Sequence, residues 1–254
     1  MFINNFDPIA LNFFSLEIRW YSLSYIFGIV LAWIYCKKFL IRDEKILKLL
    51  DDLISYIIIG IILGGRLGYV VFYNFSYYSK NLLEIFMIWE GGMSFHGGLL
   101  GVIFATYIFS KKNNINSFLF LDLISMSAPI GIFLGRIANF INSELYGRES
   151  DLFWSVKFER IDNTFRHPSQ IYEAIFEGII LFILLNFLFK KLVYKSPGFI
   201  SAIFLIFYSL FRFFIEFTRE PDAQIGYILF NLTFGQILCF FFFMFGLILF
   251  YKKK

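Results

Sequence analysis

Seven apolar stretches divide this chain and limit what it can fold into, because a helix needs about 20 apolar residues to cross the hydrocarbon core of a bilayer. Hydrophobic side chains make up 59% of the 254 residues, and aromatic ones 22%. We therefore expect an all-α polytopic membrane protein with about seven transmembrane helices, forming a single integral membrane domain over residues 1–254. The third stretch is short unless it begins near Gly92. The stretches cover residues 20–39, 53–72, 97–109, 118–141, 171–189, 198–217 and 228–251.

Basic residues gather in alternate connections and predict the orientation of the chain. With seven crossings, all four basic groups fall on one side, and positively charged connections stay in the cytoplasm. We expect the N-terminus outside and the C-terminus in the cytoplasm. Residues 1–18 contain no lysine or arginine, so they lack the start of a cleavable signal peptide, and the first apolar stretch is expected to remain. The groups are Lys37, Lys38, Arg42, Lys45 and Lys48; Lys111 and Lys112; Lys190, Lys191 and Lys195; and Lys252 to Lys254.

The longest charged connection, residues 142–170, is expected on the outer side. It holds five acidic and four basic residues, with Trp154 and Phe158 between them. Large apolar side chains inside a charged segment indicate that the segment folds on itself. We expect a small outer-face cap here, which could include strands.

Ionisable residues inside the apolar stretches are the main functional signal, because charge at lipid depth is costly and marks a site by default. Arg66, Arg136 and Arg212 are expected to share one level in the outer part of three helices, and His96 precedes the third helix. Residues 208, 212, 216 and 219 are spaced 4, 4 and 3 and lie on one helical face, as do residues 136 and 139. These groups predict a cationic pocket for the phosphate of a lipid, because arginine matches phosphate with two parallel hydrogen bonds. They are Arg66, His96, Arg136, Asn139, Tyr208, Arg212, Glu216 and Arg219.

Each of these groups also has a structural interpretation that the sequence leaves open. Arg66 could pair with the carboxylate of Glu84 or Glu90, and His96 could cap a helix. An ion pair with Glu216 could be the whole role of Arg212. Tyr21, with Trp20 and Tyr25, could belong to an aromatic belt at the membrane surface. Outside the pocket, we expect Arg160, Arg166 and His167 to be solvated loop charges and Asp122 to be an inner-surface charge.

Glycines and cysteines carry weaker signals. The glycines at 64, 65, 68, 91, 92, 97, 98 and 101 could admit a lipid head group, but small residues also pack membrane helices. Cys36 and Cys239 have no nearby histidine or second cysteine, so we interpret both as apolar thiols and expect no metal site.

Four ordered blocks resemble those of the bacterial prolipoprotein diacylglyceryl transferase family. They are Gly135 through Gly147 (GRIANFINSELYG), Phe95 through Gly98 (FHGG), Arg166 through Glu173 (RHPSQIYE) and Arg219 through Gln224 (REPDAQ). The resemblance covers nearly the whole chain and also fits the plan of seven spans with the N-terminus outside. Two positions differ from the family's pattern, Ala138 and Ser143, where glycine is common, and both replacements are small.

The resemblance implies an activity and a set of site residues. The expected enzyme transfers the sn-1,2-diacylglyceryl group of phosphatidylglycerol to the lipobox cysteine of a prolipoprotein signal peptide, forming a thioether and releasing glycerol-1-phosphate. It would work in the bacterial cytoplasmic (inner) membrane, without a cofactor and without a nucleic-acid partner. By position, the catalytic residues would be His96, Arg136 and Arg212. Substrate would be bound by Arg136, Tyr21, Asn139, Glu144, Gly147, Tyr208, Glu216 and Arg219.

The residues fit this chemistry when they are considered on their own. A leaving phosphate gains negative charge as its bond to carbon breaks, and arginines that meet this charge stabilise the transition state. The attacking thiol must lose its proton, which either His96 as a base or the field of the arginines could favour. A lipid or organic-anion transporter would use similar arginines, but no matching pair of interrupted helices occurs in two halves of the chain. A lipid-binding scaffold would leave His96 without a role.

Overall fold

The structure, a computed structural model, describes residues 2–14, 16–221, 226–229 and 231–253, which are mostly helical. The chain divides into two compact units. The first comprises residues 1–36 and 122–254, and the second residues 37–121. Residues 222–224 of the fourth family block lie outside the described residues.

Two helices that pack through glycine form the second unit. They are α2 (Glu44–Phe72) and α4 (Phe95–Lys112), joined by α3 (Phe75–Tyr78) and by two 3-10 turns, Leu82–Phe86 and Ile88–Glu90. A Cβ placed on Gly64 would collide with the backbone of Gly97, and one on Gly101 with the backbone of Gly60. These glycines therefore serve helix packing, as small residues often do in membranes.

Arg66 holds the connection between α2 and α4 in place. Its guanidinium donates to the backbone oxygens of Glu84, Ile85, Met87, Gly91 and Gly92. The Glu84 carboxylate accepts a hydrogen bond from Tyr77 instead, and the Glu90 side chain lies outside what the structure describes. Arg66 thus has the structural role that the sequence left open, with carbonyl oxygens as its partners.

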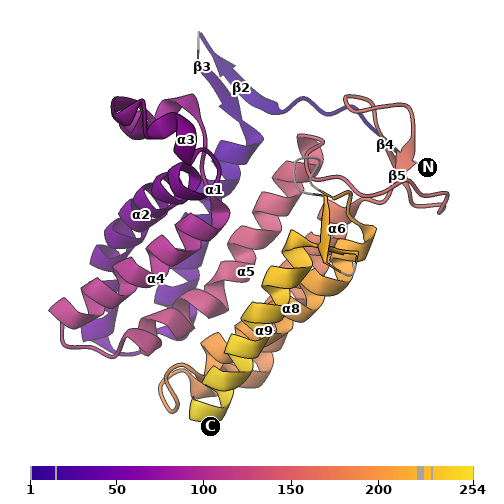
Figure 1. Cartoon of the computed structure of the whole chain (residues 1–254). Helices are drawn as coiled ribbons and strands as arrows, with labels where there is room; N and C mark the ends of the chain where they lie inside the picture. The colour runs from indigo at the N-terminus through magenta and orange to yellow at the C-terminus, as the bar shows by residue number, and fades with distance from the viewer. Residues whose placement is uncertain (1, 15, 222–225, 230, 254) are drawn as a thin grey trace. The chain divides into compact units, whose positions relative to one another are not determined.

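Six helices belong wholly or mainly to the first unit. The segment 169–192 alternates between helix types: α6 is followed by a π-helix (Ala174–Ile180), α7, a second π-helix (Leu185–Phe189) and a 3-10 turn (Lys190–Leu192). Helix α8 lies beside α9 (Figure 1). The helices are α1 (Trp20–Tyr35), α5 (Ser117–Ile141), α6 (Ser169–Glu173), α7 (Leu181–Leu184), α8 (Phe199–Ile215) and α9 (Phe234–Lys253).

Short strands of the first unit lie outside the apolar helices. Strand β1 (Phe2–Asn4) pairs in parallel with β4 (Val156–Phe158), which pairs antiparallel with β5 (Phe165–Arg166). Strands β2 (Ile9–Phe13) and β3 (Leu16–Arg19) form one hairpin, and β6 (Tyr227–Leu229) and β7 (Leu232–Thr233) another. Residues 142–170 therefore contain strands, and they share a sheet with the N-terminal segment.

Five helical stretches in the described residues are long and apolar enough to cross a membrane, which supports a multi-pass membrane protein. Helices α2 and α4, which match the second and third predicted spans, are not among them. The count of seven spans, the orientation and the outer-face cap stay predictions. The five stretches are Trp20–Leu40, Ser117–Ile141, Ser169–Leu192, Phe199–Thr218 and Phe234–Lys253.

Asp122 corrects one expectation, because its side chain is fully buried and is not a surface charge. Its carboxylate accepts hydrogen bonds from the backbone N–H of Gly198 at 2.7 Å and of Ser201 at 2.8 Å, and from the Ser201 hydroxyl at 2.6 Å. The first N–H groups of a helix have no partner within the helix. Asp122 supplies that partner for α8 and so fixes where this helix begins.

Candidate active site

The polar residues that the sequence placed on one helical face lie on α8 and on the turn that follows it. Arg212 and Glu216 are four residues apart and form an ion pair at 2.7 Å. The helix tightens after Ile215 into a 3-10 turn over Glu216–Thr218, and Arg219 then lies 4.0 Å from the Glu216 carboxylate. The predicted pair of Arg212 with Glu216 is confirmed, but it is not the whole role of Arg212.

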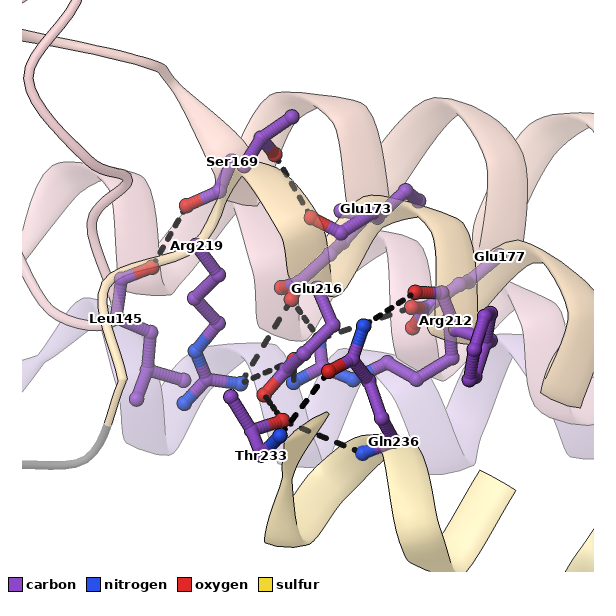
Figure 2. Close-up of polar contacts among 12 residues, drawn as sticks. Leu145, Ser169, Glu173, Glu177, Arg212, Glu216, Arg219, Thr233 and Gln236 are labelled. Carbon is purple, nitrogen blue, oxygen red and sulfur yellow. Dashed lines mark hydrogen bonds and ion pairs between the residues drawn. The ribbon is translucent and has the colours of Figure 1, made fainter. Parts of the chain in front are cut away.

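Glu173, the last residue of α6, contacts this face and also α5, and Figure 2 shows it beside Arg212 and Arg219. One of its carboxylate oxygens forms an ion pair with Arg212 and lies 3.8 Å from Arg219. Its other oxygen lies 3.0 Å from Nε of Arg136 on α5. All three arginines therefore converge on the carboxylate of one residue, at the point where α6 passes into the π-helix.

Glu177 lies one turn further along and is held more loosely. Its oxygens are 3.5 Å from Nη2 of Arg136 and 3.8 Å from Nη1 of Arg212. Neither oxygen receives a hydrogen bond among the described residues, although the side chain is fully buried. Glu173 and Glu177 thus share arginine partners but differ in the closeness of the contacts.

These six residues, the arginine–glutamate cluster, are nearly removed from solvent and balance one another in charge. The two carboxylates on the 169–192 segment are completely buried, and the arginine side chains are 10 to 17% exposed. Buried charges are stable only when they are paired. The predicted pocket was cationic and contained Glu216 as its one carboxylate, whereas in the structure three carboxylates accompany the three arginines. The cluster comprises Arg136, Glu173, Glu177, Arg212, Glu216 and Arg219.

The end of β7 and the first turn of α9 lie against Glu216 (Figure 2). The Thr233 hydroxyl donates to Oε1 of Glu216 at 2.9 Å, and the Gln236 side chain accepts from the Thr233 backbone at 3.0 Å. A Cβ on Gly235 would come within 2.8 Å of the same Glu216 oxygen. A side chain at this position would therefore push the Glu216 carboxylate away from its present place.

Two tyrosines were predicted to line the site. The Tyr208 hydroxyl, on α8, is close enough to interact with the Arg136 guanidinium. Tyr21 is 37% exposed, and its hydroxyl bonds to that of Tyr25 at 3.1 Å. The structure thus joins Tyr208 to the cluster, and the role of Tyr21 in binding stays a prediction.

The loop after α5 carries the remaining predicted residues of the 135–147 block. The Asn139 amide donates to the Glu144 carboxylate at 3.0 Å, and Asn142 donates to it at 3.3 Å. Ser143 and Leu145 adopt left-handed conformations, with φ of 58° and 55°. The loop is therefore tightly turned around an exposed Glu144, and the role of this loop in binding substrate is a prediction.

Gly147 lies where three backbone segments meet. Its N–H donates to the His167 carbonyl at 3.0 Å, and it forms a β-bridge with Arg219. A Cβ at this position would lie 2.7 Å from the Thr218 carbonyl and would also collide with His167. Gly147 thus positions the segment next to Arg219 through its backbone, whatever part it has in binding.

Arg166 is mostly buried, so the expectation of a solvated loop charge was wrong for this residue. Its side chain is 11% exposed, forms an ion pair with Asp162 at 2.6 Å and lies over the Tyr146 ring at 5.0 Å. The hydrogen bond from Arg166 lowers the pKa of Asp162 to about 2. Neighbouring His167 is half-buried, and this burial lowers its pKa.

His96 lies in the first turn of α4, in the second unit. The side chain that caps this helix is Ser94, which accepts from the Gly97 N–H at 3.2 Å. His96 is therefore not the helix cap that the sequence left open. Its role as a base stays a prediction.

Sequence reasoning missed Glu173 and Glu177 as site residues. Both fall within the apolar stretch 171–189, four residues apart, so the rule that identified the arginines also applied to them. Thr233 and Gln236 gave no comparable signal, because polar side chains at the end of a transmembrane stretch are ordinary.

Comparisons with known proteins agree with the blocks found in the sequence. The family model described as prolipoprotein diacylglyceryl transferase matches residues 8–252. A phosphatidylglycerol–prolipoprotein diacylglyceryl transferase of Rickettsia felis is 52% identical over 237 residues, covering 92% of each chain. The enzyme of the same name from Rickettsia typhi is 51% identical over 241 residues, 94% of this chain and 93% of the relative. That of Ehrlichia ruminantium (strain Welgevonden) is 50% identical over 241 residues, 93% and 92%.

Proposed function

This chain belongs to the prolipoprotein diacylglyceryl transferase family, and from that premise we propose that it transfers the diacylglyceryl group of phosphatidylglycerol to a cysteine thiol of a prolipoprotein. The reaction forms a carbon–sulfur bond and breaks the bond between the glyceryl carbon and a phosphate oxygen. The family and the names of the relatives confirm the prediction of a transferase in lipoprotein biosynthesis.

The observation that carries the assignment of the site is the meeting of Arg136 and Arg212 on the carboxylate of Glu173. Two guanidinium groups that reach one anion in this structure can reach one phosphate in the working enzyme. Negative charge grows on the leaving phosphate oxygen in the transition state, and the surroundings here are nearly free of water, so arginine stabilises that charge more than it would in solvent. Arg136 and Arg212 are the residues that we assign to the phosphate.

The thiol proton must leave as sulfur attacks, because the thiolate is the nucleophile. His96 has a suitable ordinary pKa to accept it and is our candidate for the base. The alternative is that the arginines lower the pKa of the substrate thiol without a dedicated base. In either case, the proton balances the charge of the glycerol-1-phosphate that leaves.

Both substrates reach the site through the membrane. Phosphatidylglycerol comes from the outer leaflet, and the lipobox cysteine comes on an inserted signal helix. This arrangement needs the cluster near the outer surface of a bacterial inner membrane, with seven spans and an outside N-terminus. Asn142 and Glu144, at the end of α5, would then lie at the rim where the acceptor approaches.

A reconstituted assay tests the function. Purified protein is mixed with labelled phosphatidylglycerol and a lipobox peptide, and lipid on the cysteine is measured for the wild type, Arg136→Ala and His96→Ala. We expect transfer by the wild type and a loss of at least about 100-fold for Arg136→Ala. No transfer by the wild type, where a known transferase works, would contradict the function, and a full rate for His96→Ala would remove the histidine as base. Cysteine labelling that places Lys111 and Lys195 outside would overturn the topology.

A further inference from the structure

We propose that Glu173 is the positioning residue of the arginine–glutamate cluster, holding Arg136 and Arg212 together so that both can bind one phosphate. The inference rests on the proposed function and extends it to Glu173, which ends one of the family blocks but was not among the predicted site residues. Its basis is the pattern of contacts, because Glu173 is the carboxylate of the cluster that contacts arginines of both α5 and α8 most closely.

The contacts of Glu173 are suited to this role. Its two oxygens face different arginines, with Arg136 Nε at 3.0 Å from one and Arg212 paired with the other. Two guanidinium groups repel each other strongly in a site that is nearly free of water. A carboxylate between them offsets that repulsion and fixes their spacing, and a fixed spacing is what binding of one phosphate by two arginines requires.

The backbone around Glu173 supports the same conclusion. The residue ends α6, immediately before a π-helix of seven residues, and π-helical turns often occur at functional sites. The side chain has no exposed surface and therefore little room to adopt another position. Ser169, one turn earlier, donates to the Leu145 carbonyl at 2.9 Å, which ties α6 to the loop after α5 (Figure 2).

Glu177 provides the matched control. It has the same charge, lies on the same segment one turn away, and is equally buried. Its closest arginine nitrogens, however, are at 3.5 Å and 3.8 Å, whereas Arg136 Nε lies 3.0 Å from Glu173. Neither Glu177 oxygen receives a hydrogen bond among the described residues, and the same holds for the Glu173 oxygen that faces Arg136, so the difference between the two residues toward Arg136 is one of distance. If the cluster needed only negative charge at this depth, the two residues would be equivalent. If it needs a bridge, Glu173 is the more important.

The test measures binding of fluorescent phosphatidylglycerol in detergent micelles, with phosphatidylcholine as background, alongside the transfer assay. We expect Glu173→Gln to weaken donor binding at least about 30-fold and to lower kcat/KM at least about 100-fold. Glu177→Gln also removes a buried carboxylate of the cluster, so it should lower both quantities as well, but at least about fivefold less than Glu173→Gln. Exposed Glu159→Gln, outside the cluster, should change neither. Equal losses for Glu173→Gln and Glu177→Gln would overturn the proposal.

Two further variants separate positioning from a general effect on folding. Glu173→Asp keeps the charge but draws the carboxylate back by one methylene, so we expect a folded protein with weakened donor binding, and unchanged binding would contradict the proposal. In an Arg136→Ala background, Glu173→Gln should add little further loss, because the residue acts through the arginine. Additive losses would mean that it does not. If the wild type binds phosphatidylglycerol but transfers nothing, the proposed function fails while the positioning role stands.

Discussion

The α2–α4 pair and the arginine–glutamate cluster show two opposite ways of building the interior of a membrane protein. In the pair, the backbones of Gly60 and Gly101 touch because neither residue has a side chain. In the cluster, long charged side chains fill the space between α5, α6 and α8 and neutralise one another. The first arrangement gives close packing but no side-chain functional groups. The second buries charged groups inside the protein, where every group depends on its partners.

The comparison predicts that a larger side chain at the glycine interface lowers the stability of the folded protein. Gly101→Ala should cost about 3 kcal/mol of unfolding free energy, because the added Cβ meets the backbone of Gly60 and neither helix can move away locally. Thermal unfolding in detergent measures the loss. Gly98→Ala is the control on the same helix, since its Cβ would meet only the Ile61 carbonyl at 3.8 Å, an ordinary contact. Equal stability of the two variants would show that the contact does not hold α2 to α4.

Removing a buried charge of the first unit should cost somewhat less unfolding free energy. Asp122→Ala removes the acceptor of three hydrogen bonds at the start of α8 and should cost about 2 to 3 kcal/mol. Asp43→Ala removes a similar cap from α2, but at an exposed site, and should cost about 1 kcal/mol. Chemical unfolding in mixed micelles compares the two. A larger cost at Asp43 would show that burial does not strengthen the cap.

A glycine substitution in the loop after α5 is expected to raise the stability of the protein instead of lowering it. Ser143 adopts φ of 58°, and its buried hydroxyl has no hydrogen-bond partner among the described residues. Ser143→Gly should therefore stabilise the protein by about 1 kcal/mol, the left-handed penalty outweighing the extra freedom of the unfolded chain. Ala138→Gly, within α5, should instead destabilise by about 1 kcal/mol. The unfolding midpoints of both variants test these two predictions. If both variants were less stable than the wild type, the left-handed conformation of Ser143 would not be a source of strain.

The smallest effect concerns pH. Arg166 lowers the pKa of Asp162 from 3.8 to about 2, so the charged carboxylate stabilises the folded state. This contribution is complete above about pH 4 and is lost as the pH falls toward 2. Asp162→Asn should remove that part of the acid sensitivity, seen as a flatter plot of unfolding temperature against pH. An unchanged slope would show that the ion pair has no net effect on stability.

Several parts of the fold and the site followed from local spacing in the sequence. Helical periodicity placed Tyr208, Arg212, Glu216 and Arg219 on one face, and the structure has the ion pairs that this spacing implies. Spacing within one helix depends only on the geometry of that helix, so no other part of the chain needed to be known.

Contacts between distant segments were the part that the sequence did not reveal. Arg66 was expected in the cationic pocket, with a carboxylate partner as the alternative, yet its partners are carbonyl oxygens that every residue possesses. Asp122 was interpreted as a surface charge because nothing local shows that the start of α8 packs over it. Glu173 carried the right signal inside an apolar stretch, but its partners lie 37 and 39 residues away on other helices.

The π-helix over Ala174–Ile180 restricts how the length of this segment can change in evolution. Glu173 before it is fully buried, and so are Leu181 and Leu185 after it. Deleting one residue from the π-helix would turn everything that follows by about 100° relative to Glu173, the angle between successive residues of an α-helix. The buried leucines would then face a different surface. A single insertion or deletion along residues 174–180 would therefore separate the charged cluster from the apolar packing of the same helix.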